Sequence, residues 1–279
     1  MSTLSEAAAS WASRVAVAIG EPARLAVAFS GGVDSTVLLA LAVRQLGVGR
    51  VLAVLAVSPS LAQSERESAG RSAASLGVPV IELLTHEVDD PAYRANGPDR
   101  CFHCKSALFA QIEAEVRSQY GVDAVAYGEN ADDARRLDRP GAQAATDHHV
   151  LRPLAAAGLT KTMVRELARQ LGLAVADKPA APCLASRIPH FTPVTAEKLA
   201  QIERAEAAVR SLGFSDVRVR HHGEVARVEV PQAELSLALA PGVRDRLVSA
   251  VRRAGFAYVA LDLAGLTSGA FTLAALRHD

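Results

Sequence analysis

Short apolar segments rich in valine and alanine alternate with longer segments of helical periodicity over the first part of the chain. The apolar segments cover residues 25–29, 51–57, 80–84 and 122–127. The segments 34–46, 61–76, 105–120 and 161–171 place apolar residues at helical spacing, and a glycine follows each one. Mostly apolar strands that alternate with helices predict an α/β fold with a parallel sheet covered on both faces. We expect a further helix over residues 4–19 to pack against the edge of this sheet.

The pattern changes after Ala176, where the chain becomes too rich in proline to form a helix. The prolines of this stretch are Pro179, Pro182, Pro189 and Pro193. Beyond them we expect a helix over 195–212 capped by Thr195, a hairpin of strands 217–221 and 225–230, a helix near 242–254 and a strand over 256–261. The sequence therefore predicts two domains, a parallel-sheet domain over residues 1–190 and a smaller α/β domain over residues 191–279.

Composition excludes several classes of protein. The 279 residues carry 30 Lys and Arg against 30 Asp and Glu, so the net charge is zero. This balance argues against nucleic-acid binding through an extended basic face. No run approaches the roughly 18 apolar residues of a membrane span, and no signal peptide is recognisable, so we expect a cytoplasmic protein. An odd number of cysteines, three, argues against a disulfide framework. We also expect a homo-oligomer, whose size the sequence does not give.

The strongest local motif is the string SGGVDS, which joins the first apolar strand to the first long helix. Gly31 and Gly32 allow the backbone to approach a phosphate group closely, and Ser30 and Ser35 add hydroxyl groups. The free N–H groups at the start of the following helix point at a bound anion. We expect phosphate binding here, with Asp34 needed for the chemistry. The alternative is an ordinary strand-to-helix turn capped by Ser30 or Asp34.

The three cysteines form a candidate metal site. Cys101 and Cys104 belong to RCFHCK, which we expect in a loop after the third strand, and Cys183 lies in the proline-rich stretch. Three thiolates can ligate an iron–sulfur cluster and leave one iron open to hold a sulfide. A structural zinc site that is completed by His103 is the main alternative. For Cys183 alone, an unliganded buried thiol is the simplest interpretation.

The string YGENADD follows the fourth strand, at the edge where open α/β sheets bind ligands. We expect Gly128 near a nucleotide and Asp132 or Asp133 on a magnesium ion that also binds phosphate oxygens. The alternative is a solvated turn that caps the next helix.

In the smaller domain, Arg218 and Arg220 are two positions apart on one predicted strand and therefore share a face. Two arginines on one face can bind a single phosphate group. Glu229 lies on the partner strand and Glu206 on the preceding helix. Solvated surface charge is the more common role of such arginines.

The SGGVDS string resembles the loop of the N-type ATP pyrophosphatases, the PP-loop superfamily of GMP synthetase, NAD synthetase, asparagine synthetase and the tRNA thiolases. The resemblance implies that ATP is cleaved between its α and β phosphates, that an acceptor oxygen is adenylated and that the loop holds pyrophosphate. It also implies that adenine lies beyond the second strand, close to Ser58. The string lacks the Gly-Lys-Ser/Thr ending of a Walker loop.

Several motifs together resemble one subfamily, the LarE family of ATP-dependent sulfur transferases. The motifs are SGGVDS, RCFHCK, YGENADD, Asp138 to Gly141, CLASRIP and RVRHHG. The resemblance implies that ATP and Mg²⁺ adenylate a carboxylate of a pyridinium biscarboxylate mononucleotide, and that sulfur then displaces AMP during synthesis of the nickel-pincer nucleotide of lactate racemase.

The resemblance also implies roles for single residues. Cys183 matches the sulfur-bearing cysteine of the family. A phosphate and metal pocket is matched by Glu206 (or Glu203, one helical turn away), Arg218, Arg220 and Glu229. Family members with two additional cysteines resemble the type that carries a [4Fe-4S] cluster and uses sulfide or another sulfur donor. Cys101, Cys104 and Cys183 place this sequence with that type. A cluster-dependent tRNA thiolase and a non-enzymatic adenine-nucleotide module with structural zinc are the alternatives.

Overall fold

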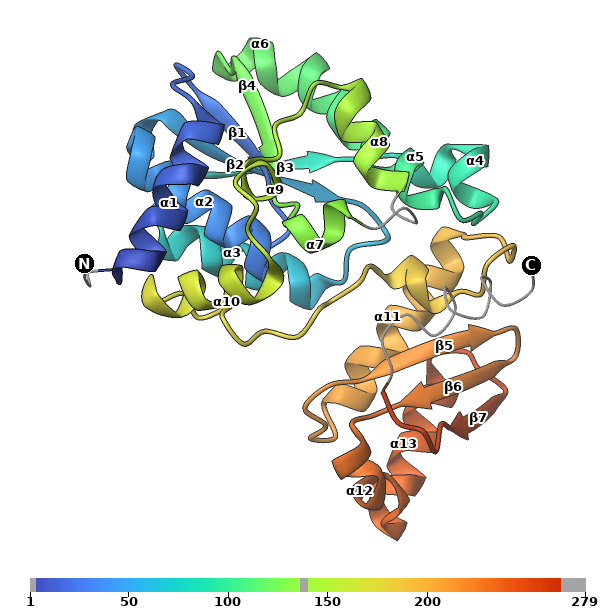
Figure 1. Ribbon diagram of the computed structural model, residues 1–279. Helices are drawn as coiled ribbons and strands as arrows, with labels where there is room; N and C mark the ends of the chain where they lie inside the picture. The colour runs from blue at the N-terminus through green and yellow to red at the C-terminus, as the bar shows by residue number, and fades with distance from the viewer. Residues whose placement is uncertain (1–3, 136–139, 267–279) are drawn as a thin grey trace. The chain divides into compact units, whose positions relative to one another are not determined.

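The computed structural model describes residues 4–135 and 140–266, so the Asp138 motif lies largely outside the described residues. The chain divides into two compact units (Figure 1). The first comprises Met1–Glu87 and Cys101–Ala181, and the second comprises Val88–Arg100 and Pro182–Asp279. No helix in the described residues is long and apolar enough to cross a membrane.

The division between the units differs from the change near residue 190 that the sequence pattern suggested. Residues 182–190 belong to the second unit because they bond to a segment far away in the sequence. The amide of Asn96, which is fully buried, donates to the carbonyl oxygens of Pro189 and Thr192 at 2.8 and 3.0 Å. The guanidinium group of Arg100 donates to the carbonyl of Ala185 at 3.1 Å. These contacts tie Val88–Arg100 to the second unit.

The first unit is built on a four-stranded parallel sheet in the order β3-β2-β1-β4. The strands are β1 (Leu25–Ala28), β2 (Val51–Val57), β3 (Val80–Leu84) and β4 (Ala124–Tyr127). The alternation of side chains along β1 divides the interior in two, since Leu25 and Val27 enter one apolar cluster and Ala26 enters the other. This confirms the α/β fold with a parallel sheet that is buried on both faces.

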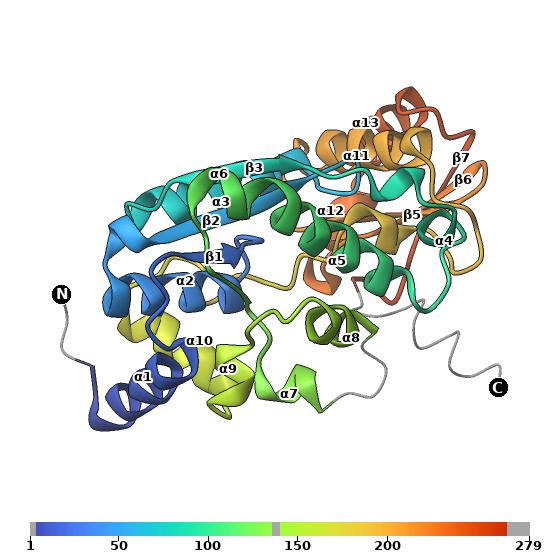
Figure 2. The ribbon, with the colours of Figure 1, turned by 90° about the horizontal axis from the view of Figure 1, so that it is seen from above.

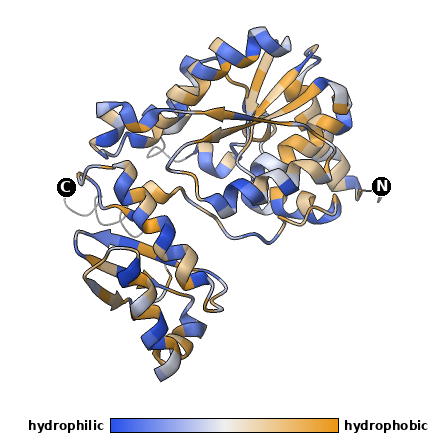
Figure 3. Ribbon diagram, turned by 180° about the vertical axis from the view of Figure 1, so that it is seen from behind, coloured by the Kyte–Doolittle hydropathy of each residue, from blue (hydrophilic) through white to orange (hydrophobic). Residues whose placement is uncertain are grey.

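Helices cover both faces of this sheet (Figure 2). One apolar cluster contains residues of α1 (Glu6–Ile19), α2 (Val33–Leu46), α3 (Gln63–Ser75), α9 (Pro153–Ala156) and α10 (Lys161–Gln170). The other contains residues of α5 (Arg100–Gln111), the π-helical turn Ile112–Val116 and α8 (Pro140–Asp147). The chain also forms α6 (Arg117–Tyr120) and α7 (Ala131–Ala134). In Figure 3 the strands of this unit are largely hydrophobic and the helices carry hydrophilic residues as well.

The sequence suggested that helix α1 packs against the edge of the sheet, and this expectation is not met. Its main neighbours are α2, α9 and α10, and its buried residues Ala8, Val15 and Ile19 join the cluster that those helices form with the sheet. The expectation was wrong because the apolar face of a helix shows only that it is buried, and not against which element.

The RCFHCK string is helical, which corrects its placement in a loop. Helix α5 begins at Arg100 and continues through the π-helical turn to Tyr120. Arg100 is buried, and its guanidinium group donates to the side-chain oxygen of Asn96 and to the carbonyl of Ala185. These bonds to distant residues fix the first turn of the helix, and no periodic pattern in the local sequence reports them.

The second unit contains a three-stranded sheet in the order β5-β6-β7. Strands β5 (Arg218–His222) and β6 (Val225–Glu229) form the expected antiparallel hairpin, and β7 (Tyr258–Leu261) pairs with β6 in parallel. The helices are α4 (Pro91–Arg94), α11 (Ala196–Arg210), α12 (Leu235–Leu239) and α13 (Pro241–Arg253). Thr195 caps α11 through a hydrogen bond from the backbone N–H of Lys198.

Short 3-10 turns occur in both units, at Val48–Arg50, Glu87–Asp89, Leu184–Arg187 and Gln232–Glu234.

Candidate functional site

The glycine-rich loop follows β1 at the carboxyl edge of the parallel sheet and leads into α2. Gly31 has a φ of +67°, and a Cβ atom there would lie 2.6 Å from the Cα of Ala69 in α3. Only glycine fits this position without strain or a clash. Gly32 is the N-cap of α2, and among the described residues no side chain caps this helix. The first N–H groups of α2 are therefore left for an anion or water.

The serines of the loop bond to each other and shape it. The Ser35 hydroxyl donates to the carbonyl of Gly32 at 3.1 Å and accepts from the backbone N–H of Ser30 at 3.3 Å. The Ser30 and Ser35 hydroxyls lie 3.2 Å apart, and the N–H of Gly32 donates to the Ser30 hydroxyl at 3.4 Å. These hydrogen bonds stabilise the conformation of the loop.

Gly128, in the loop after β4, packs directly against the start of α2. A Cβ atom on Gly128 would lie 2.6 Å from the backbone nitrogen of Ser35. The structure therefore brings the YGENADD string next to the SGGVDS loop, as expected from the positions of both at the carboxyl ends of neighbouring strands.

Two residues that are distant in the sequence, Lys161 and Asn130, contact the carboxylate of Asp34. Its carboxylate forms an ion pair with the ammonium group of Lys161 and accepts a hydrogen bond at 3.3 Å from the amide of Asn130. Asn130 also caps α7, because its side-chain oxygen accepts from the N–H groups of Asp132 and Asp133, each at 3.0 Å. One asparagine thus links the loop aspartate to the acidic helix.

The two candidate magnesium ligands of α7 have different partners. One carboxylate oxygen of Asp132 accepts from the backbone N–H of Lys161 at 2.8 Å. A carboxylate oxygen of Asp133 accepts from the amide of Asn130 at 2.8 Å. Both aspartates are thus linked to Asp34 through Asn130 or Lys161, but the three carboxylates do not form a metal-binding group among the described residues.

Ser58 follows β2, and its hydroxyl donates to one carboxylate oxygen of Glu87. The side chain of Glu87 is buried, and its other oxygen has no hydrogen-bond partner among the described residues. A buried carboxylate oxygen without a partner is costly unless a ligand or water supplies a donor. Ser58 thus lies beside a buried carboxylate oxygen of Glu87 that can accept a hydrogen bond from a nucleotide.

The two cysteines of RCFHCK lie on one helix. Cys101 is exposed and Cys104 is partly exposed. Their spacing of three residues in α5 places both side chains on the same face of the helix. Cys183 is exposed and belongs to the second unit. Within residues 4–135 and 140–266 no group of three or more His, Cys, Asp or Glu side chains is arranged to hold a metal ion.

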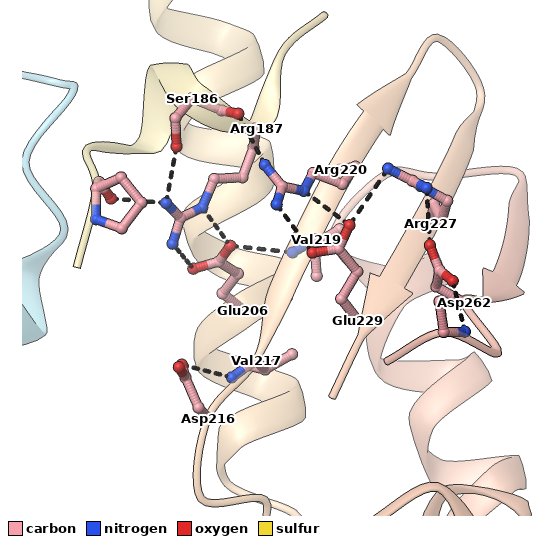
Figure 4. Close-up of polar contacts among 12 residues, drawn as sticks. Ser186, Arg187, Glu206, Asp216, Val217, Val219, Arg220, Arg227, Glu229 and Asp262 are labelled. Atoms are coloured by element: carbon pink, nitrogen blue, oxygen red, sulfur yellow. Dashed lines mark hydrogen bonds and ion pairs between the residues drawn. The ribbon is translucent and has the colours of Figure 1, made fainter. Parts of the chain in front are cut away.

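The second unit contains a buried cluster of arginines and glutamates around β5 and β6 (Figure 4). Arg220 forms a two-bond ion pair with Glu229, with both nitrogen-to-oxygen distances 2.9 Å. Arg227 adds a contact of 3.2 Å to Glu229. The Glu229 carboxylate is fully buried, and arginines contact both of its oxygens. Arginine side chains therefore surround Glu229. The metal ion that we expected at Glu229 would have to bind this carboxylate together with the arginines.

Glu206, one of the two glutamates considered for this pocket, faces this cluster. Its carboxylate pairs with Arg187 at 2.8 and 3.2 Å and accepts from the backbone N–H of Val219 at 3.0 Å. Arg187 also donates to the carbonyl oxygens of Pro182 and Cys183, at 2.6 and 3.2 Å. Arg187 therefore connects the segment that carries the candidate sulfur-bearing cysteine to the arginine and glutamate cluster.

Arg218 is buried in the same region, which is unusual for a strand arginine. Its burial lowers the pKa of the guanidinium group, and the positive charge of Arg187 lowers it further. For Arg187, burial also acts to lower the pKa, but the Glu206 carboxylate outweighs burial and raises it. The region around Arg218 thus disfavours an additional positive charge, and a bound anion would be stabilised there.

Sequence reasoning missed several residues that contact the loop or the cluster, among them Lys161, Lys178 and Arg187. One signal was available, since the chain has only four lysines, Lys105, Lys161, Lys178 and Lys198. Two of these four contact the SGGVDS loop, Lys161 at Asp34 and Lys178 at the Gly31 carbonyl. A lysine that occurs in an arginine-rich sequence is therefore a useful candidate for a phosphate site.

Comparison with known proteins gives relatives along nearly the whole chain. No protein-family model matches it. The chain is 40% identical over 250 residues to an uncharacterized protein of Synechocystis, covering 90% of this chain and 92% of that protein. It is 36% identical over 246 residues to the pyridinium-3,5-bisthiocarboxylic acid mononucleotide synthase of Lactiplantibacillus plantarum, covering 88% of each chain.

A more distant similarity covers about half of the chain. The argininosuccinate synthase of Natronomonas pharaonis is 29% identical over 165 residues, which cover 54% of this chain and 40% of that enzyme. This similarity fits a PP-loop domain built on the parallel sheet and the SGGVDS loop. Together with the identity to the synthase of L. plantarum over most of both chains, it shows that the chain belongs to the LarE family of ATP-dependent sulfur transferases.

Proposed function

We propose that this protein converts a carboxylate of a pyridinium biscarboxylate mononucleotide into a thiocarboxylate in nickel-pincer nucleotide synthesis. ATP is cleaved to AMP and pyrophosphate, the substrate carboxylate is adenylated, and sulfur then displaces AMP. The family supports sulfur transfer, and the name of the L. plantarum relative supports the choice of substrate. A cytoplasmic location and a homo-oligomer remain predictions from the sequence.

The observation that carries the proposal is the geometry of the loop. Gly31 packs against Ala69 in a conformation that only glycine takes easily, and the first N–H groups of α2 have no side-chain cap among the described residues. Backbone donors at a helix start favour a bound phosphate group. The same donors stabilise the charge that develops on pyrophosphate as it leaves.

The chemical reason for adenylation is the poor reactivity of a carboxylate. Its oxygen is a very poor leaving group, whereas the phosphate ester formed with AMP leaves readily. Asp34 and Asp132 supply carboxylate oxygens next to the loop, and these fit a magnesium ion that also binds phosphate oxygens. Such an ion supplies charge neutralisation and orients the phosphate groups.

We assign the phosphate of the mononucleotide substrate to Arg218 and Arg220. What supports this assignment is the burial of Arg218 near other arginines, where an anion would relieve repulsion between positive charges. Arg220 is already paired with Glu229, so it acts as an oriented donor whose position is fixed before the substrate binds.

We assign a [4Fe-4S] cluster to Cys101, Cys104 and Cys183. What supports this assignment is that Cys101 and Cys104 are at least partly exposed and lie on one face of α5, at a spacing that allows both to reach one cluster. When bound through three thiolates, such a cluster offers an open iron position for the sulfide that is transferred.

Product analysis tests the proposal. With ATP, Mg²⁺ and the pyridinium biscarboxylate mononucleotide, we expect AMP and pyrophosphate to form only when the mononucleotide is present. Formation of ADP and inorganic phosphate would exclude the reaction. If tRNA, and not the mononucleotide, stimulated pyrophosphate release, the tRNA thiolase alternative would be correct.

Metal analysis tests the cluster. After anaerobic reconstitution we expect iron and sulfide in the protein, a brown colour, and loss of iron when any one of the three cysteines is changed to serine. Adenylation should continue in these variants because the loop is untouched. Zinc without iron in the reconstituted protein would support the structural zinc alternative instead.

A further inference from the structure

Lys178 lies in the segment after α10, and its ammonium group contacts the glycine-rich loop. The Nζ atom donates to the carbonyl oxygen of Gly31 at 3.4 Å, to a carboxylate oxygen of Glu65 at 2.7 Å and to the hydroxyl of Ser68 at 3.0 Å. These three contacts use the three donors of an ammonium group. Glu65, Ser68 and the Ala69 that packs on Gly31 share one face of α3.

The backbone of Lys178 is anchored, and its side chain is the adjustable part. The backbone N–H donates to the carbonyl of Val175 at 3.1 Å, and the carbonyl accepts from Arg165 at 3.0 Å. The side chains of Lys178 and Glu65 remain 19% and 28% exposed. A lysine tip on a flexible four-carbon stem can therefore change partners without movement of the main chain.

We propose that Lys178 binds phosphate oxygens held in the SGGVDS loop, and that Glu65 is a competing internal partner that holds the ammonium group while the loop is empty. This inference rests on the proposed role of the loop in ATP and pyrophosphate binding. When phosphate arrives, the ammonium group exchanges the Glu65 carboxylate for a phosphate oxygen. The ion pair between Lys178 and Glu65 thus sets the affinity of the loop for pyrophosphate.

The physical argument compares the two anions that compete for one ammonium group. The Nζ atom is already next to the Gly31 carbonyl, so a phosphate group cradled by the loop is within its reach. Pyrophosphate carries more negative charge than one carboxylate, and an ion pair as exposed as Lys178 with Glu65 is weak. Exchange of the Lys178 ammonium group from Glu65 to phosphate is therefore favourable. The loss of the ion pair with Glu65 reduces the net gain in binding free energy.

Calorimetric titration with inorganic pyrophosphate and Mg²⁺ tests this inference, because it predicts opposite effects for the two partners of one ion pair. Lys178→Met should weaken pyrophosphate binding by about 10-fold or more, as expected for a lost hydrogen bond between charged groups. Glu65→Gln should strengthen binding by about two- to fivefold, since it removes the competitor. A pair that only stabilises the fold would give changes of the same sign in both variants.

Two controls sharpen the result. Glu67→Gln removes the same charge from the same helix at an exposed position that pairs with Arg71, and it should leave pyrophosphate affinity unchanged. In the double variant Lys178→Met/Glu65→Gln the gain from Glu65→Gln should vanish. Equal losses in both single variants, or a gain that persists without Lys178, would overturn the inference and leave the proposed function intact. Absence of pyrophosphate binding by the unaltered protein would instead contradict the role of the loop.

Discussion

The two charged regions of the molecule differ in how their ion pairs are buried. At the glycine-rich loop, the pairs of Lys161 with Asp34 and Lys178 with Glu65 keep between 17% and 38% of each side chain exposed. In the second unit, the side chains of Arg220 and Glu229 are 3% and 0% exposed. The loop pairs are therefore weak and exchangeable, whereas the pair in the second unit is fixed.

This difference matches the ligands that we propose. A loop that must bind ATP and then release pyrophosphate benefits from charges that can change partners. A pocket that only has to recognise one phosphate group benefits from arginines held in one orientation before the substrate arrives. The comparison can be tested by removing single members of each region.

The largest effect is expected for Glu229→Ala. It leaves Arg220 buried without its carboxylate partner and should lower the free energy of unfolding of the second unit by about 3–5 kcal/mol. Denaturant unfolding measures this loss. Asp245→Asn, at the exposed pair with Arg244, is the matched control and should change stability by no more than about 0.5 kcal/mol. Similar small losses in both variants would show that the buried pair is not fixed.

Gly31→Ala should have the next largest effect, on the loop. The positive φ and the clash with Ala69 together cost about 2–4 kcal/mol, which should appear as lost pyrophosphate binding and slower AMP formation. Gly70→Ala is the control, because Gly70 lies in α3 without a positive φ and an added Cβ would have no atom within 4 Å. Equal activity of the two variants would exclude a tight cradle at Gly31.

Arg218→Ala should act on the substrate alone. Loss of a hydrogen bond to a charged group predicts weaker mononucleotide binding by about 1.5–3 kcal/mol, with the affinity for ATP almost unchanged. Separate titrations with the two ligands measure this. If ATP binding fell as much as mononucleotide binding, the assignment of the arginines would be wrong.

The smallest effect concerns pH. Burial lowers the pKa of His221, and the charge of Lys198 lowers it further, so this imidazole binds a proton less readily in the folded protein than in the unfolded chain. The unfolded chain binds a proton below its ordinary pKa of about 6.5, so stability is full above that pH and falls as the pH drops below it. Unfolding at pH 7.5 and 5.5 should show a smaller decline for His221→Gln than for the unaltered protein. His149→Gln, at an exposed position, should keep the full decline.

Much of the first unit could be predicted because its signals are local. Apolar segments of five to seven residues contain β1 to β4, and glycines end the helices that follow, as Gly47 does after α2 and Gly121 after α6. The loop was recognisable for the same reason, since strand, glycines and helix are contiguous. Local chemistry was therefore enough to predict a glycine-rich loop between β1 and α2.

The partners of the site residues could not be predicted, because they come from distant positions. Lys178 is 147 residues from Gly31, and Arg100 is 85 residues from the Ala185 carbonyl that helps fix the start of α5. Glu206 was a candidate, but its pairing with Arg187 depends on how a 3-10 turn packs against a helix. The burial of Arg218 could not be predicted either. The alternation of residues along a strand does not show whether the face with the charged residues is covered by other elements.

The central claim, sulfur transfer to an adenylated carboxylate through a three-cysteine cluster, is tested most directly by mass spectrometry of both product and protein, with and without added sulfide. We predict that the anaerobic protein with sulfide, ATP and Mg²⁺ replaces oxygen by sulfur in many mononucleotide molecules per chain, while Cys183 stays intact. A single sulfur per chain with conversion of Cys183 to dehydroalanine, or equal transfer by the Cys101→Ser/Cys104→Ser protein, would contradict the claim.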